Sequence, residues 1–232
     1  SSENEMAKKY LNAIIIDNHP LLVQNIRDIL YDIGRSGDNL NFYIKVAKDC
    51  DEALSLLHRM EQNSKSIDLV LLEIGIPPSE SGKYVSGEDI AVAIRERFKN
   101  ARIIINTAFE NNYRISTILK RVNPEGLIVR SDMSREVLIA AIQRVLEKDI
   151  FYSSGVLKFI RRRLDHDITL DELDIRILYE LSQGSKMKDL PEMLPFSLAT
   201  IEKRKHRLKV LFKVEEVHDR QLFDLARKYG FI

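Results

Sequence analysis

Short apolar runs alternate with helical patterns from Leu11 to Glu147. The apolar runs are rich in Val, Ile or Leu, which is typical of strands buried on both faces. They lie at residues 13–16, 42–47, 67–72, 102–106 and 126–129. Amphipathic stretches follow them at residues 21–31, 51–60, 87–98, 112–121 and 134–147. This alternation predicts a parallel, doubly wound α/β sheet of five strands.

The pattern changes after Lys148. Residues 151–163 are predicted to form a connector helix or linker, and from Thr169 onward every apolar pattern is helical. Four helices are predicted in this region. The first has an apolar stripe at residues 173–181 and ends at Gly184, the second is short and spans 188–193, the third begins after the cap Ser197, and the fourth spans 221–229. We therefore expect an α/β domain at 1–148, a linker at 149–168 and an all-α domain at 169–232.

Composition narrows the class of protein. A chain of 232 residues with 44% hydrophobic residues is long enough for two domains with cores of their own. The single cysteine, Cys50, excludes an intramolecular disulfide and fits a reducing compartment. It precedes a predicted helix, where a structural role is favoured over a reactive one. Neither a signal peptide nor an apolar run of about 18 residues is found. We expect a cytoplasmic protein without a membrane partner.

A basic segment marks the all-α domain. Residues 203–213 contain six Lys or Arg, one His and no acid, although the whole chain has a formal charge of only +1. A short helix and a tight turn precede this segment, as in a helix-turn-helix. Such a focused positive charge suits the neutralisation of DNA phosphates. The alternative is an ordinary solvated helix face.

Residues 170–232 resemble the LuxR/NarL-type DNA-binding domain, a four-helix unit. The similarity is carried by "LDELDIRILYELSQGSKMKDLPEMLPFSLATIEKRKHRLKVLFKV". It implies that α-helical residues beginning at Ser197 contact double-stranded DNA. The residues implied as base or phosphate contacts, with their basic neighbours, are Lys188, Thr200, Glu202, Lys203, Arg204, His206 and Arg207.

Two positions depart from that family pattern. Glu202 places a negative charge where the family often has Lys, which repels phosphate unless the carboxylate accepts from a cytosine amine. Lys205 replaces an apolar residue in the packing stripe, so its stem is expected to snorkel. The target DNA sequence does not follow from the protein sequence.

In the α/β domain, polar residues stand where the predicted strands end. Asp17 and Asn18 follow the first strand, Glu73 the third, Thr107 the fourth and Arg130 the fifth. Because the carboxyl ends of parallel strands share one edge, these side chains are expected to meet in a pocket. Two carboxylates with an amide suit a hard cation, whereas a hydroxyl and a guanidinium suit an anion. The alternative is ordinary capping of strand ends.

The phrases "AIIIDNHPLL", "IDLVLLEIGIPP", "RIIINTAF" and "GLIVRSD" resemble the receiver domain of two-component response regulators, a flavodoxin-like fold. In that family an acidic pair binds magnesium and an Asp accepts a phosphoryl group, which a hydroxyl and a Lys then contact. The resemblance places Asp17 and Asn18 at the acidic pair, Glu73 at the acceptor, Thr107 at the hydroxyl and Arg130 at the lysine.

Several of these positions differ from the family. Asn18 removes a charge, Glu73 is one methylene longer than Asp, and Arg130 is a planar fork in place of a point charge. Leu127 stands at the usual aromatic switch, and an insertion at 79–86 lengthens a loop that is expected to cover the site. We predict a degenerate receiver that is not phosphorylated and needs no cofactor, with weak magnesium binding by Asp17, Asn18 and Glu73 left open. In this hypothesis Glu73 stands in for the phosphorylated Asp and pairs with Arg130 or Thr107.

The sequence as a whole favours an atypical NarL/FixJ-type response regulator, a homodimeric DNA-binding transcription regulator that is not an enzyme. A cognate histidine kinase has no clear role in this scheme. Candidate dimer faces are residues 21–31 and 134–147. The alternatives are a magnesium-dependent phospho-accepting switch and a protein-binding adaptor that no longer binds DNA. The five His lack ligand spacing, and His19 beside the pocket is expected to cap a loop.

Overall fold

The computed structural model describes residues 8–37, 39–215 and 217–232, so residues 1–7 of the predicted α/β domain lie outside the described part. The chain divides into two compact units. In the described part of the chain, the sheet unit comprises residues up to 109 and residues 118–156, and the helical unit comprises residues 110–117 and those from 157 onward. The domain boundaries near 148 and 169 remain a prediction from the sequence.

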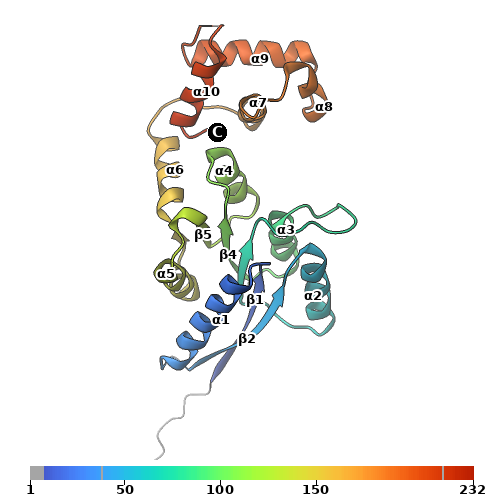
Figure 1. The fold of residues 1–232 in the computed structure, drawn as a ribbon, viewed down its shortest axis with the longest axis vertical. Helices are drawn as coiled ribbons and strands as arrows, with labels where there is room; N and C mark the ends of the chain where they lie inside the picture. Colours follow the sequence, from blue (N-terminus) through green and yellow to red (C-terminus); the bar gives the residue numbers. More distant parts are fainter. Residues whose placement is uncertain (1–7, 38, 216) are drawn as a thin grey trace, which may run out of the picture. The chain divides into compact units, whose positions relative to one another are not determined.

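The sheet unit contains a parallel sheet in the order β2-β1-β3-β4-β5-β6 (Figure 1). Its strands are β1 (Lys9–Ile16), β2 (Leu40–Ala47), β3 (Leu69–Glu73), β4 (Arg102–Thr107), β5 (Gly126–Val129) and β6 (Phe151–Tyr152). The first five confirm the predicted α/β sheet.

The sixth strand corrects the sequence analysis, which assigned its residues to the linker. Phe151 N–H donates to Glu125 O at 2.8 Å and Ser153 N–H donates to Leu127 O at 3.0 Å, so this segment extends the sheet at the edge of β5. Phe151 also packs against the core of the sheet unit. A strand of two residues is too short to produce a period-two pattern, which is why periodicity missed it.

Helices cover both faces of the sheet. They are α1 (Pro20–Arg35), α2 (Cys50–Gln62), α3 (Gly87–Arg97) and α5 (Arg135–Leu146), and a 3-10 turn, η1, covers Arg130–Asp132. The helix α4 (Asn112–Arg121) begins in the helical unit and ends in the sheet unit. Asp49, Ser86 and Ser134 cap α2, α3 and α5 by accepting backbone hydrogen bonds, which fixes where these helices begin.

The core explains why the strands are apolar at nearly every position. Ala13 and Ile15 of β1 pack with α1 and α5 in one cluster. Their neighbours Ile14 and Ile16 are also almost fully buried, at 1% and 0% exposure. Successive side chains of a strand point to opposite faces, so burial of all four requires a covering layer on each side.

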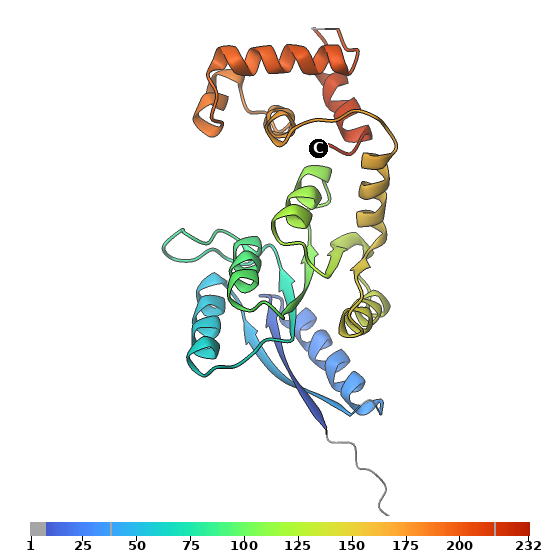
Figure 2. The same cartoon turned by 180° about the vertical axis from the view of Figure 1, so that it is seen from behind.

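The helical unit is built from α6, which begins in the sheet unit, and from the helices that follow it (Figure 2). They are α6 (Ser154–Leu164), α7 (Glu172–Ser182), the 3-10 turn η2 (Met187–Asp189), α8 (Leu190–Met193), α9 (Leu198–Leu211) and α10 (Asp219–Lys228). The predicted helical pattern of this region is confirmed. Among the described residues, no helix combines the length and apolar character that crossing a bilayer requires.

Local signals set the limits of α7 and α9 as predicted. Gly184 has a φ of +95° just beyond α7, and Ser185 N–H donates to Glu180 O at 3.1 Å, which closes the helix in a Schellman-type turn. Ser197 caps α9 by accepting from Thr200 N–H at 3.2 Å. The apolar side of α9 is buried, with Ile201 in one apolar cluster and Leu208 in another.

Candidate functional site

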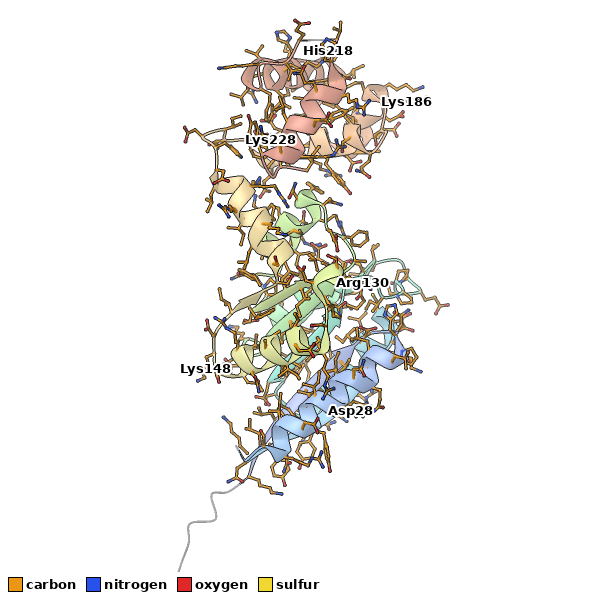
Figure 3. The ribbon with its side chains drawn as sticks, turned by 60° about the vertical axis from the view of Figure 1, so that its left-hand side comes forward. Asp28, Arg130, Lys148, Lys186, His218 and Lys228 are labelled. Atoms are coloured by element: carbon orange, nitrogen blue, oxygen red, sulfur yellow. The ribbon has the colours of Figure 1, made fainter. Side chains whose placement is uncertain are left out.

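The polar residues at the strand ends differ sharply in burial. Asp17, Glu73 and Thr107 are 1%, 1% and 0% exposed, whereas Asn18 is exposed. Arg130 begins the turn after β5, with its side chain 49% exposed (Figure 3). The sequence predicted that these strand ends converge. The structure brings Glu73 to both Asp17 and Arg130.

Glu73 has a partner at each of its carboxylate oxygens. Arg130 Nη2 donates to Oε2 at 3.1 Å, and Gly75 N–H donates to Oε1 at 3.0 Å. The Glu73 side chain is only 2% exposed, so its charge depends on these donors for compensation. The pair therefore joins a fixed buried anion to a cation that reaches in from the surface.

Two glycines make this position of Glu73 possible. A Cβ at Gly87 would lie 2.1 Å from Glu73 O, so α3 can begin against the end of β3 only with glycine there. A Cβ at Gly75 would lie 3.2 Å from Glu73 Oε1, the oxygen that the Gly75 amide itself contacts. The backbone thus leaves room for the longer Glu side chain.

The Thr107 hydroxyl already takes part in a hydrogen bond within its own turn. Its Oγ1 accepts from Phe109 N–H at 3.0 Å and belongs to the turn after β4. Of the two partners that the sequence analysis left open for Glu73, the structure shows the ion pair with Arg130.

Asp17 and His19 form a second contact in the pocket. Asp17 Oδ1 accepts from His19 N–H at 2.8 Å and lies 2.7 Å from His19 Nδ1. Asp17 Oδ2 is buried and has no hydrogen-bond partner among the described residues. His19 occupies the N-cap position of α1, but its side chain makes no capping hydrogen bond. The ring instead contacts Asp17 within the loop between β1 and α1, so the loop-capping role stays a prediction.

The family resemblance implies magnesium at this pocket, and the donors present do not fit it. Magnesium takes oxygen ligands in near-octahedral geometry. Here Asn18 replaces one carboxylate and is exposed, both oxygens of Glu73 have donors, and the nearest additional group is an imidazole.

The inserted loop at residues 79–86 is fastened to the neighbouring helices. Glu80 N–H donates to Asp51 at 2.9 Å and Val85 N–H donates to Asp89 at 2.7 Å. These hydrogen bonds run to α2 and α3, so covering of the pocket by this loop stays a prediction.

Burial, followed by the nearby charge of Asp89, raises the pKa of Cys50 to about 11, as suits a structural thiol.

The candidate DNA contacts divide into two groups. Lys203, His206 and Arg207 are exposed on α9, together with Glu202, and Lys188 is exposed on η2, although Arg207 Nη2 also lies 3.2 Å from Asp174 Oδ2. Thr200 is half-buried in the first turn of α9, where its hydroxyl lies 3.1 Å from the Ser197 hydroxyl. These positions are compatible with the contacts that the family resemblance implies.

Arg204 is only partly exposed, and contacts within the helical unit hold its guanidinium. Its Nη1 lies 2.9 Å from Asp171 Oδ2 and 3.0 Å from Asp174 Oδ1, and its guanidinium stacks over Phe196 at 4.3 Å. The side chain is 22% exposed. Asp171 caps α7 and Asp174 is 4% exposed, so Arg204 ties α9 to the start of α7. The sequence analysis counted this charge as a DNA contact and missed its acidic partners.

Asp219 engages two more residues of the basic run. Lys205 Nζ lies 2.9 Å from Asp219 Oδ2 and Lys209 Nζ lies 2.6 Å from Oδ1, with Lys209 nearly buried. Burial alone would raise the pKa of Asp219, but hydrogen bonds from the two ammonium groups outweigh it and leave that pKa below its ordinary value. Lys205 thus ends on a carboxylate instead of reaching for solvent from an apolar stripe.

Comparison with known proteins gives a consistent picture. No family model matches the chain. It is 26% identical over 196 residues to the nitrate/nitrite response regulator protein NarP of Escherichia coli, covering 82% of each chain. It is 23% identical to the DNA-binding transcriptional activator EvgA of Escherichia coli, covering 95% of this chain and 100% of EvgA. The homologues of this chain are response regulators of the NarL/FixJ family.

Solved structures agree with these relatives in fold. RcsB from Salmonella enterica serovar Typhimurium, bound to promoter rprA in the presence of the phosphomimetic BeF3−, is 20% identical, with a TM-score of 0.60. The match covers 95% of this chain and 98% of RcsB. A structure of two RcsB dimers bound to two parallel DNAs gives the same TM-score at 19% identity. The fold is that of a receiver domain followed by a helical helix-turn-helix domain.

Proposed function

We propose that this protein is a DNA-binding transcription regulator of the response-regulator type, in which a Glu73–Arg130 ion pair replaces phosphorylation. The observation that carries the proposal is the 3.1 Å contact between Arg130 Nη2 and Glu73 Oε2. In the family mechanism phosphorylation extends the acceptor side chain and increases the negative charge at this strand end. Glu73 supplies a permanent carboxylate there and Arg130 supplies its cation.

This arrangement keeps the receiver in one state, and we assign that state as the DNA-binding one. The carboxylate is buried and hydrogen-bonded from two sides, so moving it out of these contacts costs free energy. A receiver that carries its charge in the sequence needs no phosphoryl donor. Its output is then set by protein abundance or by another ligand.

The DNA-binding half of the proposal rests on α9. Lys203 and Arg207 are exposed on the same stretch of helix, and His206 lies between them in the sequence. Printed descriptions of the relatives support it, since EvgA is called a DNA-binding transcriptional activator and RcsB is seen on promoter DNA. Lys203 and Arg207 contact phosphates or guanine edges, and Glu202 accepts from a cytosine amine. Arg204 holds the helix in place.

A homodimer is part of the proposal, with α1 as its face in the sheet unit. Leu21 and Tyr31 are 83% and 64% exposed on α1, whereas no large hydrophobic side chain of α5 is comparably exposed in the described part of the chain. Exposed apolar side chains on one helix are typical of an association surface. Two half-sites about one turn of DNA apart then match the two protomers.

Selection of bound sequences from random DNA at physiological salt tests the DNA-binding function. We expect a two-fold related pair of half-sites and an affinity that falls steeply with salt, because bound phosphates release counterions. Lys203→Ala is expected to weaken binding and to reduce the salt slope by about 1. Lys228→Ala on α10 removes another exposed charge and serves as the control. Failure to enrich any sequence, with no affinity for DNA at low salt, would leave the protein-binding adaptor as the better description.

Incubation with acetyl phosphate and magnesium, followed by intact-mass measurement, tests the receiver. We expect no phosphoryl adduct on the wild-type protein under conditions that phosphorylate an ordinary receiver run in parallel. A stoichiometric adduct that disappears in Glu73→Gln would instead establish the phospho-accepting switch.

A further inference from the structure

We propose that the receiver pocket binds a divalent transition-metal ion of the zinc class through Asp17, His19 and Glu73. One ligand atom from each of these residues lies within 4.8 Å of the others. They come from the end of β1, the turn before α1 and the end of β3, so the fold assembles them from three segments. The proposal concerns this chain's own histidine and differs from the oxygen-only magnesium site of the family.

The buried oxygen of Asp17 points to a missing ligand. Asp17 is 1% exposed, and its Oδ2 has no hydrogen-bond partner among the described residues, while Oδ1 accepts from the His19 amide and contacts the His19 ring. An unsatisfied buried carboxylate oxygen is expensive, and an ion is one of the few groups that satisfies it. The observation is independent of the clustering of the three residues.

The donor set selects the type of metal. Imidazole nitrogen is a poor ligand for magnesium and a good one for zinc, cobalt, nickel and copper, whereas carboxylates serve either class. Zinc bonds to nitrogen and oxygen are about 2.0–2.2 Å long, so ligand atoms around one tetrahedral ion lie about 3.4 Å apart. Closure from the observed separations requires side-chain movements of about 1 Å, which the exposed His19 ring permits.

Arg130 is the competitor for this ion. Its guanidinium contacts Glu73 Oε2, and a metal that takes Glu73 displaces it. The Arg130 side chain is 49% exposed and can move into solvent without leaving a buried cation. Metal binding and the Glu73–Arg130 pair are therefore alternative states of one pocket, which gives a receiver without phosphorylation a ligand input.

The effect on DNA rests on the proposed function, but metal binding itself does not. Metal binding is measured on the full-length, chelator-stripped protein without DNA, so that the metal site and the proposed DNA-binding function can fail separately. Zinc affinity is measured by competition with a chromophoric chelator, and cobalt(II) is added as a spectroscopic probe. We expect one high-affinity equivalent, a cobalt visible spectrum of a four-coordinate site, and no displacement by millimolar magnesium.

Variants locate the site. His19→Gln and Asp17→Asn are expected to weaken zinc binding at least about tenfold and to abolish the cobalt spectrum. Arg130→Gln is expected to tighten binding, since it removes the competing cation. His58→Gln in the sheet unit and His218→Gln, which removes the imidazole 3.6 Å from Glu215, are the controls and leave the spectrum unchanged. Circular dichroism verifies that each variant is folded.

Two results would overturn the proposal. The first is a His19→Gln protein that is folded and binds zinc with wild-type affinity and stoichiometry. The second is weaker zinc binding in Arg130→Gln, which would mean that the guanidinium does not compete for Glu73.

Discussion

Arg130 Nη2 lies 3.1 Å from Glu73 Oε2, although the Arg130 side chain is 49% exposed and the Glu73 side chain only 2%. The two residues therefore depend on this ion pair to different degrees. The buried carboxylate depends on the guanidinium more than the guanidinium depends on it. An ordinary exposed ion pair contributes little, but removal of the partner from a buried charge is costly.

The first prediction concerns the stability of the sheet unit. Arg130→Gln leaves Glu73 buried without its cation and is expected to lower the free energy of unfolding by about 1–3 kcal/mol. Denaturant unfolding followed by circular dichroism measures it. Adding Glu73→Gln to Arg130→Gln removes the stranded charge and is expected to recover part of the loss. Equal stability of Arg130→Gln and the wild type would mean that the pair is not formed in solution.

The second prediction separates two adjacent basic residues of α9. Arg204→Ala removes the main partner of the buried Asp174 and of the helix cap Asp171, so we expect a loss of about 2 kcal/mol in stability of the helical unit. Lys203→Ala is expected to leave the melting temperature unchanged and to lower DNA affinity. The comparison uses thermal melts and DNA titrations on the same preparations. A stable Arg204→Ala protein that has lost only DNA affinity would return Arg204 to the DNA contacts.

The third prediction is a dependence of stability on acid. The pKa of Asp219 in the folded protein lies below its ordinary value, because the hydrogen bonds from Lys209 and Lys205 outweigh the opposing effect of burial. A carboxyl with a lowered folded pKa stabilises the fold above its unfolded pKa of about 3.9, and this stability is lost as pH falls through the folded pKa. Asp219→Asn is therefore expected to be less stable than the wild type at neutral pH, with a difference that shrinks below about pH 4. A difference that is the same at both pH values would contradict the ionic origin.

Periodicity and strand-end chemistry were sufficient to predict much of this molecule. The strands from β1 to β5 and the helices around them are fixed by buried apolar runs and caps such as Ser134 and Ser197, which are local features. Convergence of Asp17 and Glu73 followed from the parallel sheet, because its topology brings strand ends together.

What the sequence did not predict depends on partners far along the chain. Arg204 and Asp174 are 30 positions apart, and nothing in the basic run indicates that a buried acid neutralises part of it. The contact between the His19 ring and Asp17 is local, two positions apart, but it was missed because a helix N-cap position predicts a capping side chain and not one that faces a strand end. Composition reports the number of charges, and the fold decides which of them remain exposed.

The claim that the Glu73–Arg130 pair holds the receiver in its DNA-binding state is tested most directly by the Glu73→Ala variant. Its dimerisation and its binding of the selected operator DNA are titrated beside those of the wild type. Arg130→Gln, tested in parallel, breaks the same pair from its exposed side. We expect both folded variants to dimerise less and to bind the operator at least about tenfold more weakly, a change of about 1.4 kcal/mol. Dimerisation and operator affinity equal to the wild type in both variants would contradict it.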